Sequence, residues 1–472
     1  MKKVLTAILV LSMILSFSII GFADEAAETM HPDEECDVVV IGGGGSGIAA
    51  ACTAFDEGLD VIIVEKMPML GGNTNLATTQ MWAAGSRMQQ EAGQTETAED
   101  FYNFIMSGKG AGLGLEPNAT MFMCENSGAA VDWLLDNGVE FGRVFNIYSH
   151  GPADGGAPGP VIMTGLRNAL DTRGIDYRLN TKATEILMNE EGAACGIKVE
   201  SPEGNYTINA KCVVIAAGGF ANNNEMVTQY DPRWPGLGCN SSPSQTGDGI
   251  IMGEAVGAKL GDMENITINP TVLYRDEGLY SLTALRTNGA ILVNNSGKRF
   301  WNEESAYTPQ AEALLQQDKQ EAFMIFDQTM LDTVGLIAQY AERDFFAKAD
   351  TVEDLADQLG IDPAGLAETV ETYKGFVEAG EDAEFGRKFM TVGFDNPPYY
   401  GVKVFPSVQT TSGGIVINFK AEVISTNDTI IPGLFACGAV TCDGTRAVSP
   451  LTKTFVYGRA AGASAVAYVK GE

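Results

Sequence analysis

Continuous runs of apolar, β-branched residues predict buried strands near both ends of this chain. Asp37–Ile41 and Asp60–Val64 form two such runs, and Lys211–Gly219 forms a third that ends in glycines. Unbroken runs are typical of parallel strands covered on both faces, because neither face then meets water. Ser46–Glu57, between the first two runs, has the pattern of a helix. Strand, helix and strand in this order predict a βαβ unit within a parallel sheet.

The apolar pattern changes near residue 265 and returns near residue 410. Helices are predicted near 99–106, 119–137 and after Asp248, with short strands over 176–210. The stretch 265–409 is more polar and contains two predicted helices, near 354–358 and 363–379. Apolar strand runs resume at Ser412, and a helix near 454–469 follows them. We therefore predict a Rossmann-like α/β domain built from residues 36–264 and 410–472, with an α+β domain of residues 265–409 inserted in it.

The first 23 residues have the pattern of a secretory signal peptide. Two lysines precede an apolar run, and small residues follow near Ala23, where a signal peptidase would cleave. We expect an exported protein, periplasmic, cell-surface or secreted, with a linker at residues 24–35. An uncleaved membrane anchor is the alternative, because the apolar run is long enough to span a bilayer.

Composition and charge exclude several classes of function. The chain has 472 residues, is 45% hydrophobic and carries a net charge of −31, so it is a globular protein repelled by nucleic acid and by anionic lipid. Its eight cysteines form neither CxxC nor CxxCH, which argues against an iron–sulfur cluster and covalent haem. Only two histidines occur, His31 and His150, and no metal site is expected.

A glycine-rich turn directly after the first strand predicts a dinucleotide site. Gly42 permits the tight turn, Gly44 lets a pyrophosphate approach the backbone, and Gly47 lets the helix pack on the strand. Glu65 ends the second predicted strand, where a carboxylate accepts hydrogen bonds from a ribose diol. A turn that merely packs a helix against a sheet would not require this acid.

Further motifs give the chain a family resemblance. They are GGNT (71–74), VVIAAGGF (213–220), TGDG (246–249), INPT (268–271), GAILVNNSGKRFWNE (289–303), TSGG (411–414), GLFACGAV (433–440) and YGRAAG (457–462). From about Asp37 to Ala467 the chain resembles the FAD-dependent fumarate reductase/succinate dehydrogenase flavoprotein superfamily. That superfamily includes flavocytochrome fumarate reductases, urocanate reductases and 3-ketosteroid dehydrogenases.

The resemblance implies non-covalent FAD and an inserted domain that caps the substrate. It implies a set of FAD contacts in the order of the chain: Gly42, Gly44, Gly45, Ser46, Gly47, Glu65, Lys66, Gly71, Gly72, Asn73, Thr74, Ala183, Ala217, Gly218, Gly219, Asp248, Gly438, Ser449 and Leu451. One departure lies in the GEV motif of many relatives, where Ala439 cannot bond the ribityl chain, although Asp443 lies nearby.

The chain departs from the fumarate reductase pattern at most of the substrate positions. Where the resemblance places two substrate histidines, the chain has Asn269 and Thr410. A relay Glu is replaced by Thr283, whereas the relay Arg is matched by Arg286. Leaving a carboxylate of a dianion unpaired in a dry site costs several kcal/mol. These changes argue against fumarate as the main substrate.

Tyr307 stands where the proton-donating Arg of fumarate reductases is expected. Three roles remain open for it: a packing or surface residue, a wall that stacks on the substrate, or a proton donor with Arg286 as the stabilising cation. Arg446 aligns with a substrate-clamping Arg after a one-residue gap, so it holds a single carboxylate or is a surface residue. His150 matches a loop that borders the flavin, and contacts FAD or substrate or is structural.

We predict a FAD-dependent reductase of an activated C=C bond in an α,β-unsaturated carboxylate or enone. The resemblance implies hydride from flavin N5, a proton from Tyr307, and electrons from an external donor, a membrane-linked cytochrome or flavoprotein. Two alternatives remain: a 3-ketosteroid-type dehydrogenase or reductase, and a non-catalytic exported flavin-binding redox module.

Overall fold

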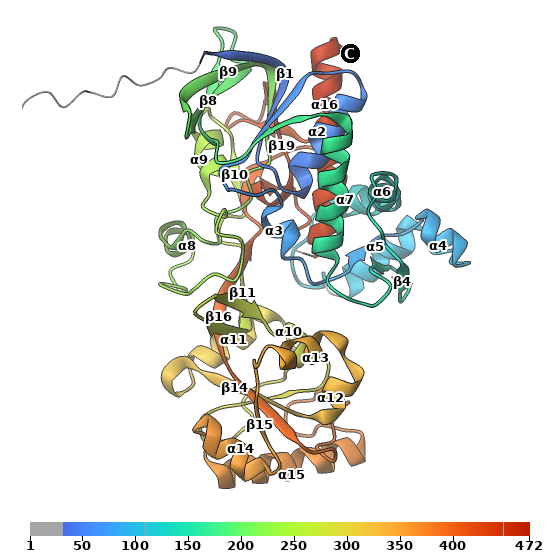
Figure 1. Ribbon diagram of the computed structural model, residues 1–472, viewed down its shortest axis with the longest axis vertical. Coiled ribbons are helices and arrows are strands. Elements are labelled where there is room, and N and C mark those ends of the chain that lie inside the picture. Colours follow the sequence, from blue (N-terminus) through green and yellow to red (C-terminus); the bar gives the residue numbers. More distant parts are fainter. Residues whose placement is uncertain (1–31, 109, 447) are drawn as a thin grey trace, which may run out of the picture.

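The structure is a computed structural model that describes residues 32–108, 110–446 and 448–472. The expected signal segment and most of the linker lie outside these residues. The molecule is elongated, with a larger domain and a smaller one joined by two long strands, β11 (Ile266–Arg275) and β16 (Tyr399–Thr411) (Figure 1). We call the smaller domain, formed by these two strands and the residues between them, the cap.

The larger domain is built on one mostly parallel sheet. Its order is β18-β19-β9-β1-β2-β6, with the β7–β8 hairpin attached to β9. Parallel pairing places Val39 opposite Ile62 on one side and Val213 on the other. The bounds are β1 Glu34–Ile41, β2 Val61–Val64, β6 Asp176–Arg178, β7 Lys182–Met188, β8 Ala194–Ser201, β9 Gly204–Ile215, β18 Glu422–Ile424 and β19 Ile430–Ala436. The predicted βαβ unit and the sheet built from both chain ends are present.

Helices from distant parts of the chain pack together on this sheet. The first helix of the βαβ unit, α2 (Gly45–Asp56), lies between α7 (Pro158–Arg173) and the terminal α16 (Pro450–Lys470) (Figure 1). The other helices of this domain are α3 Gly72–Asn75, α4 Arg87–Glu91, α5 Ala98–Ser107, α6 Pro117–Asp136, α8 Asn224–Tyr230, α9 Asp248–Ala255 and the 3₁₀ turn η2 Gly438–Val440. Two small sheets complete it: β3 Met81–Trp82, β4 Arg143–Phe145 and β5 Ser149–Gly151; and β10 Leu260–Gly261, β17 Gly414–Val416 and β20 Thr441–Cys442.

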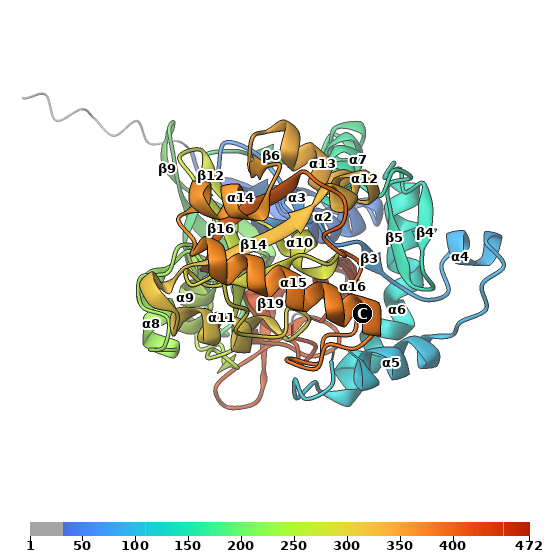
Figure 2. The same cartoon turned by 90° about the horizontal axis from the view of Figure 1, so that it is seen from below.

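The cap has a mainly antiparallel sheet and its own hydrophobic core. The strand order is β12-β11-β16-β14-β13, and β15 also pairs with β16. Its other elements are β12 Gly278–Ser281, α10 Thr283–Thr287, β13 Ile291–Val293, α11 Tyr307–Leu315, η1 Asp318–Gln320, β14 Ala322–Asp327, α12 Gln328–Thr333, α13 Gly335–Glu342, β15 Ala347–Ala349, α14 Val352–Leu359 and α15 Pro363–Ala379. The α14–α15 pair covers the end farthest from the larger domain, and α10 and α11 lie on the side that faces it (Figures 1 and 2).

Candidate functional site

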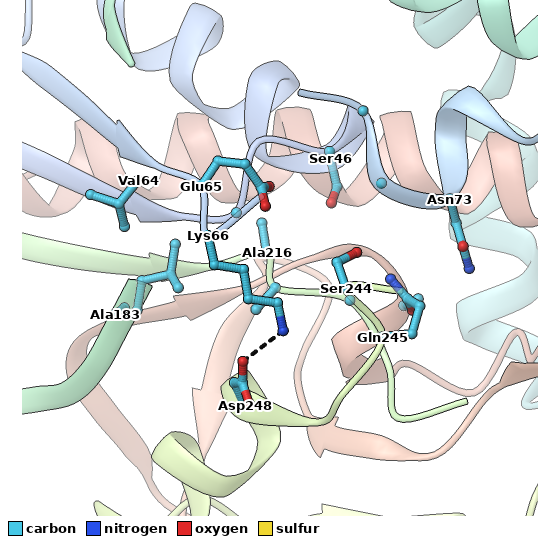
Figure 3. A pocket seen from close by; sticks show the side chains of 18 of the residues that line it. Ser46, Val64, Glu65, Lys66, Asn73, Ala183, Ala216, Ser244, Gln245 and Asp248 are labelled. Atoms are coloured by element: carbon cyan, nitrogen blue, oxygen red, sulfur yellow. Dashed lines mark hydrogen bonds and ion pairs between the residues drawn. The ribbon is translucent and has the colours of Figure 1, made fainter. Parts of the chain in front are cut away.

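A cavity lies where β1, β2 and β9 end, at the carboxyl edge of the parallel sheet (Figure 3). It encloses about 720 Å³ of empty space, part of it open to solvent. Most of the predicted cofactor contacts line it: Gly42, Gly44, Gly45, Ser46, Glu65, Lys66, Gly71, Gly72, Asn73, Thr74, Ala183, Ala217, Gly218 and Asp248. The edge of a parallel sheet is the usual place for a nucleotide in such folds.

The turn between β1 and α2 leaves room for phosphate groups. Gly42 has a φ of +110°, and a Cβ there would lie 2.5 Å from the carbonyl oxygen of Ala216. A Cβ on Gly47 would lie 2.0 Å from the carbonyl oxygen of Gly42, so α2 approaches the strand as closely as glycine allows. At Gly44, by contrast, the nearest atom is 3.8 Å away, and no side chain caps α2 there. An open glycine at an uncapped helix start fits a pyrophosphate.

Acidic and basic side chains border the other end of the cavity. The Glu65 carboxylate accepts hydrogen bonds from the backbone N–H groups of Gly43 and Met67, both at 2.9 Å. Each carboxylate oxygen keeps a lone pair with which it can accept a ribose hydroxyl. Lys66 Nζ lies 2.7 Å from Asp248 Oδ2, which pairs the end of β2 with the start of α9 (Figure 3). These groups, with the glycine turn, fit FAD.

The loop of α3 is tied to a segment that sequence reasoning did not identify. Asn73 Oδ1 accepts from the backbone N–H of Ser242 at 2.7 Å, and its Nδ2 donates to Ser241 Oγ at 3.2 Å. Nearby, Gln245 Oε1 accepts from the N–H of Gly219 at 2.8 Å and, with Ser244, lines the cavity. Both residues directly precede the TGDG motif, which could have indicated them.

Five predicted cofactor contacts do not line the cavity. An added Cβ on Gly47 would meet Gly42, one on Gly219 would meet Thr411, and one on Gly438 would meet Ser46. The Ser449 hydroxyl hydrogen-bonds that of Thr452 at 2.7 Å, and Leu451 belongs to the hydrophobic core.

Asp443, noted beside Ala439, is already paired. Its Oδ2 lies 2.8 Å from Lys453 Nζ, and both side chains are buried. Ala439 itself lines the cavity.

A second polar cluster gathers four of the predicted substrate-site residues in the cap. The Tyr307 hydroxyl donates to Thr283 Oγ1 at 3.1 Å. Asn269 Nδ2 donates to Ser281 Oγ at 2.8 Å and to Thr283 Oγ1 at 3.4 Å. The Arg286 guanidinium lies over the Tyr307 ring, 4.5 Å from its centroid. Tyr307 begins α11, and Thr283 and Arg286 lie on α10, so these two short helices position the cluster.

Arg286 is a buried cation held in one place. Its side chain is nearly enclosed, and Nη1 donates to the carbonyl of Ser305 and to Gln310 Oε1, both at 2.7 Å. Burial lowers the pKa of the guanidinium below its ordinary value, an effect that the contact with Tyr307 opposes. An arginine nevertheless stays protonated in a protein, so a fixed positive charge lies against the tyrosine ring.

The remaining predicted site residues lie outside this cluster. Thr410 pairs with Thr267 where β16 meets β11. Arg446 has a φ of +50°, and its Nη2 lies 3.3 Å from Asp262 Oδ2. With the amide oxygen of Asn265 turned toward it, Nη1 and Nε of Arg446 donate at 3.0 Å. Asp262 therefore already offsets part of the positive charge of Arg446.

His150 is a structural residue in this fold. It is fully buried, its Nε2 lies 2.7 Å from Ser86 Oγ, and its Nδ1 lies 2.9 Å from the carbonyl oxygen of Tyr148. Burial also lowers the pKa of its imidazole. Because both ring nitrogens have hydrogen-bond partners and the side chain is fully buried, we do not include His150 in the proposed substrate site.

Comparison with known proteins identifies flavoproteins. Residues 37–456 match the family described as FAD binding domain. The chain is 35% identical over 461 residues to fumarate reductase (cytochrome) of Shewanella frigidimarina. The aligned region covers 94% of this chain and 80% of that protein. It is 32% identical over 455 residues to urocanate reductase of Eggerthella lenta, covering 92% of this chain and 75% of that protein.

Comparison with solved structures also finds oxidoreductases of this fold. The chain is similar to a flavocytochrome c3 fumarate reductase in its open conformation, with a TM-score of 0.81 and 33% identity over 93% of this chain and 79% of that one. A 3-ketosteroid-Δ4-(5α)-dehydrogenase from Rhodococcus jostii RHA1 shares the fold, with a TM-score of 0.69 and 24% identity over 94% and 99% of the two chains.

Within the described ranges, no helix is both long and apolar enough to cross a membrane.

Proposed function

Because this chain belongs to the FAD-dependent oxidoreductase family that includes the fumarate reductases, we propose that it reduces the activated C=C bond of an α,β-unsaturated carboxylate or enone. FAD is its cofactor, and chemistry at C=C bonds is that of its family. We propose non-covalent binding, since the described residues that line the cavity include no His, Cys or Tyr that could form a bond to the flavin.

The observation that carries the proposal is the contact between Tyr307 and Arg286. Bound FAD supplies the hydride. The Tyr307 hydroxyl gives its proton to the α-carbon, as a general acid, and the Arg286 guanidinium stabilises the phenolate that forms. Both side chains come from α10 and α11, on the side of the cap that faces the cofactor domain (Figure 1).

The charges around the site favour a neutral or singly charged substrate. Asn269, Thr410 and Tyr307 are neutral where the family resemblance implies cationic groups, and Arg446 shares its charge with Asp262. Arg446 can therefore pair with at most one carboxylate group of a substrate. Related proteins carry the names fumarate reductase, urocanate reductase, NADH:acrylate oxidoreductase and digoxin reductase, which supports a choice of substrate that varies among relatives.

We also propose export and a separate electron donor. The apolar segment at the N-terminus supports export. The chain has no CxxCH motif, so we propose that a cytochrome or flavoprotein, linked to the membrane, delivers the electrons.

Anaerobic turnover tests the substrate class. The purified holoprotein, reduced with dithionite, is mixed with a cinnamate-like acid, a simple enone, a steroid enone and fumarate, and flavin absorbance is followed. We expect fast reoxidation by the acid or the enone. Preference for the steroid would favour the ketosteroid-type alternative, and no reoxidation by any compound would favour a flavin-binding module. Fumarate as the fastest acceptor would contradict the proposed substrate class.

The proton donor is tested by Tyr307→Phe. Removing the hydroxyl should lower the rate of flavin reoxidation by about 10²-fold or more, because general acid catalysis contributes on this scale. Tyr274→Phe is the matched control, since Tyr274 is a partly exposed residue of the same domain on β11. If the two variants reoxidise the flavin at equal rates, Tyr307 is a packing residue and not the proton donor.

A further inference from the structure

We propose that Gln310 is a positioning residue, which holds the Arg286 guanidinium against the ring of Tyr307 and leaves its positive charge uncompensated. The inference rests on the proposed function, because the charge matters to the reaction only if Tyr307 gives up its proton. It assigns a role to a residue that none of the sequence motifs indicated.

Gln310 lies three positions after Tyr307 in α11. Residues at this spacing are neighbours on one face of a helix, so both side chains can reach the same guanidinium. Arg286 Nη1 donates to Gln310 Oε1 at 2.7 Å, and the central carbon of the guanidinium lies 4.5 Å from the centroid of the Tyr307 ring. The carbonyl oxygen of Ser305 accepts from the same nitrogen, also at 2.7 Å. A side-chain oxygen and a main-chain oxygen of one segment therefore fix the position of Arg286.

Only the oxygen of the Gln310 amide has a partner. The side chain is fully buried, and its Nε2 has no hydrogen-bond partner among the described residues. A buried amide nitrogen without a partner costs free energy, and an apolar side chain of the same length would avoid that cost. Packing alone therefore does not account for a glutamine at this position, whereas the hydrogen bond from Arg286 does.

The partners of Arg286 Nη1 are neutral, although a buried carboxylate lies on the same segment. That carboxylate, Glu303, accepts from Arg299 Nε at 2.9 Å, and its Oε2 lies 3.4 Å from Arg387 Nη1. Within the described ranges, no ion pair includes Arg286. Its positive charge therefore remains available to an anion that forms on Tyr307.

The charge acts on the step in which Tyr307 loses its proton. As the O–H bond breaks, the proton passes to the substrate carbon and the electron pair stays on the phenolate oxygen. A fixed cation at the ring stabilises this phenolate more than the neutral phenol, which lowers the barrier. An ionised acceptor at position 310 would also hold the guanidinium, but it would offset the charge. A neutral acceptor therefore serves the reaction best.

Two substitutions of Gln310 in the holoprotein separate its hydrogen bond from its neutrality. Gln310→Met keeps the length of the side chain and removes the acceptor, whereas Gln310→Glu keeps the acceptor and adds a negative charge. Each should slow the reoxidation of dithionite-reduced flavin by the best substrate by about 10-fold or more. The substrate concentration that gives half the maximal rate should change by less than about 2-fold, because the fully buried Gln310 does not contact the substrate. Gln316→Met, at the exposed end of the same helix, is the control and should keep the wild-type rate.

Two readouts separate positioning from packing. In a Tyr307→Phe background, neither substitution of Gln310 should lower the rate further, because the phenolate that Arg286 stabilises no longer forms. In thermal unfolding, Gln310→Glu should stay within a few degrees of the wild type, because a charge-assisted hydrogen bond replaces the neutral one. Its loss of rate then does not come from a loss of fold.

The outcomes are distinguishable. If Tyr307→Phe is slow while either substitution of Gln310 keeps the wild-type rate, the positioning role is overturned and the proposed function stands. A loss of the same factor in the Tyr307→Phe background also overturns it, because packing would then be responsible. If the wild type reduces no compound of the panel, the proposed function fails, and the role of Gln310 with it.

Discussion

At the scale of single residues, the Lys66–Asp248 pair should make stability depend on pH. Burial raises the pKa of Asp248, but hydrogen bonds and charge from Lys66 outweigh it and leave the pKa below its ordinary value. A carboxyl group whose pKa is lower in the folded state stabilises the fold at pH values above its unfolded-state pKa of about 3.9. This contribution is lost as the pH falls through the pKa of the folded state. We expect Asp248→Asn to lower Tm by about 2 °C at pH 7, for a partly exposed pair worth about 1 kcal/mol.

The pH series decides this prediction. The difference between Asp248→Asn and wild type, measured by thermal unfolding, should shrink as the pH falls below about 4. The control is Asp428→Asn, because the Lys259–Asp428 pair has the same kind of contact on an exposed surface. A difference that persists unchanged to pH 3 would contradict the pKa argument.

How far the site could be predicted depends on how local its residues are in sequence. Gly42, Gly44 and Glu65 were predictable because a turn and two strand ends define them within one βαβ unit. Tyr307 was indicated only by the family resemblance. Its hydrogen bond to Thr283, which in turn contacts Ser281, was not foreseen, because pairing of β11 with β12 and the fold of α11 bring distant residues together. Sequence spacing contains no information on such a contact.

At the scale of elements, the crossing of α16 and α2 depends on small residues. A Cβ on Gly458 would lie 2.7 Å from the carbonyl oxygen of Ser46, which is a backbone atom and cannot turn away. Gly458→Ala should therefore separate the helices and lower the free energy of unfolding by about 1–3 kcal/mol, as overpacking does. Because Ser46 lines the cofactor cavity, FAD should also bind more weakly, which titration of the apoprotein measures.

The matched control is Gly375→Ala in α15. Gly375 lies inside a helix, and apart from its chain neighbours and the backbone of its own helix no atom lies within 4 Å of an added Cβ. Alanine should stabilise the protein there by up to about 1 kcal/mol, because it loses less backbone entropy on folding. Destabilisation of the same size by both substitutions would contradict this prediction, because the close approach of α16 to α2 would then not be the cause.

Elements with local signals were predicted, and those without them were not. The helix 363–379 was predicted where α15 lies, because Asp362 caps its start, a proline follows, and Gly380 ends it in the left-handed conformation. The sheet of the cap was not predicted. Its inner strand β14 is buried on both faces and has no alternation, and such a short apolar run does not distinguish a strand from a helix. The third predicted strand stops early, at Ile215, because the glycine-rich turn that contains Gly218, with φ +77°, follows it.

At the scale of the whole molecule, the described residues form two large hydrophobic cores joined by two strands, and a third, smaller cluster lies around α5 and α6 of the larger domain. One core fills the cofactor domain, and a separate one fills the cap. The expected boundaries at 265 and 409 lie beside the start of β11 and the end of β16. The change in polarity along the chain could indicate an inserted domain, because an insertion interrupts one apolar pattern and a second core begins. The angle between the two bodies has no such signal in the sequence.

Two cores predict two unfolding steps that respond to different changes. The cavity that fits FAD is lined by residues of the larger domain, so excess FAD should raise the transition of that domain, by about 2.7 kcal/mol at 100 times the dissociation constant, and leave the cap transition in place. Leu355→Ala, at a fully buried position of α14, should lower only the cap transition, since it costs about 2–5 kcal/mol in the second core. Differential scanning calorimetry of apo and holo forms measures both. A single transition that moves with either change would instead mean that β11 and β16 couple the domains into one cooperative unit.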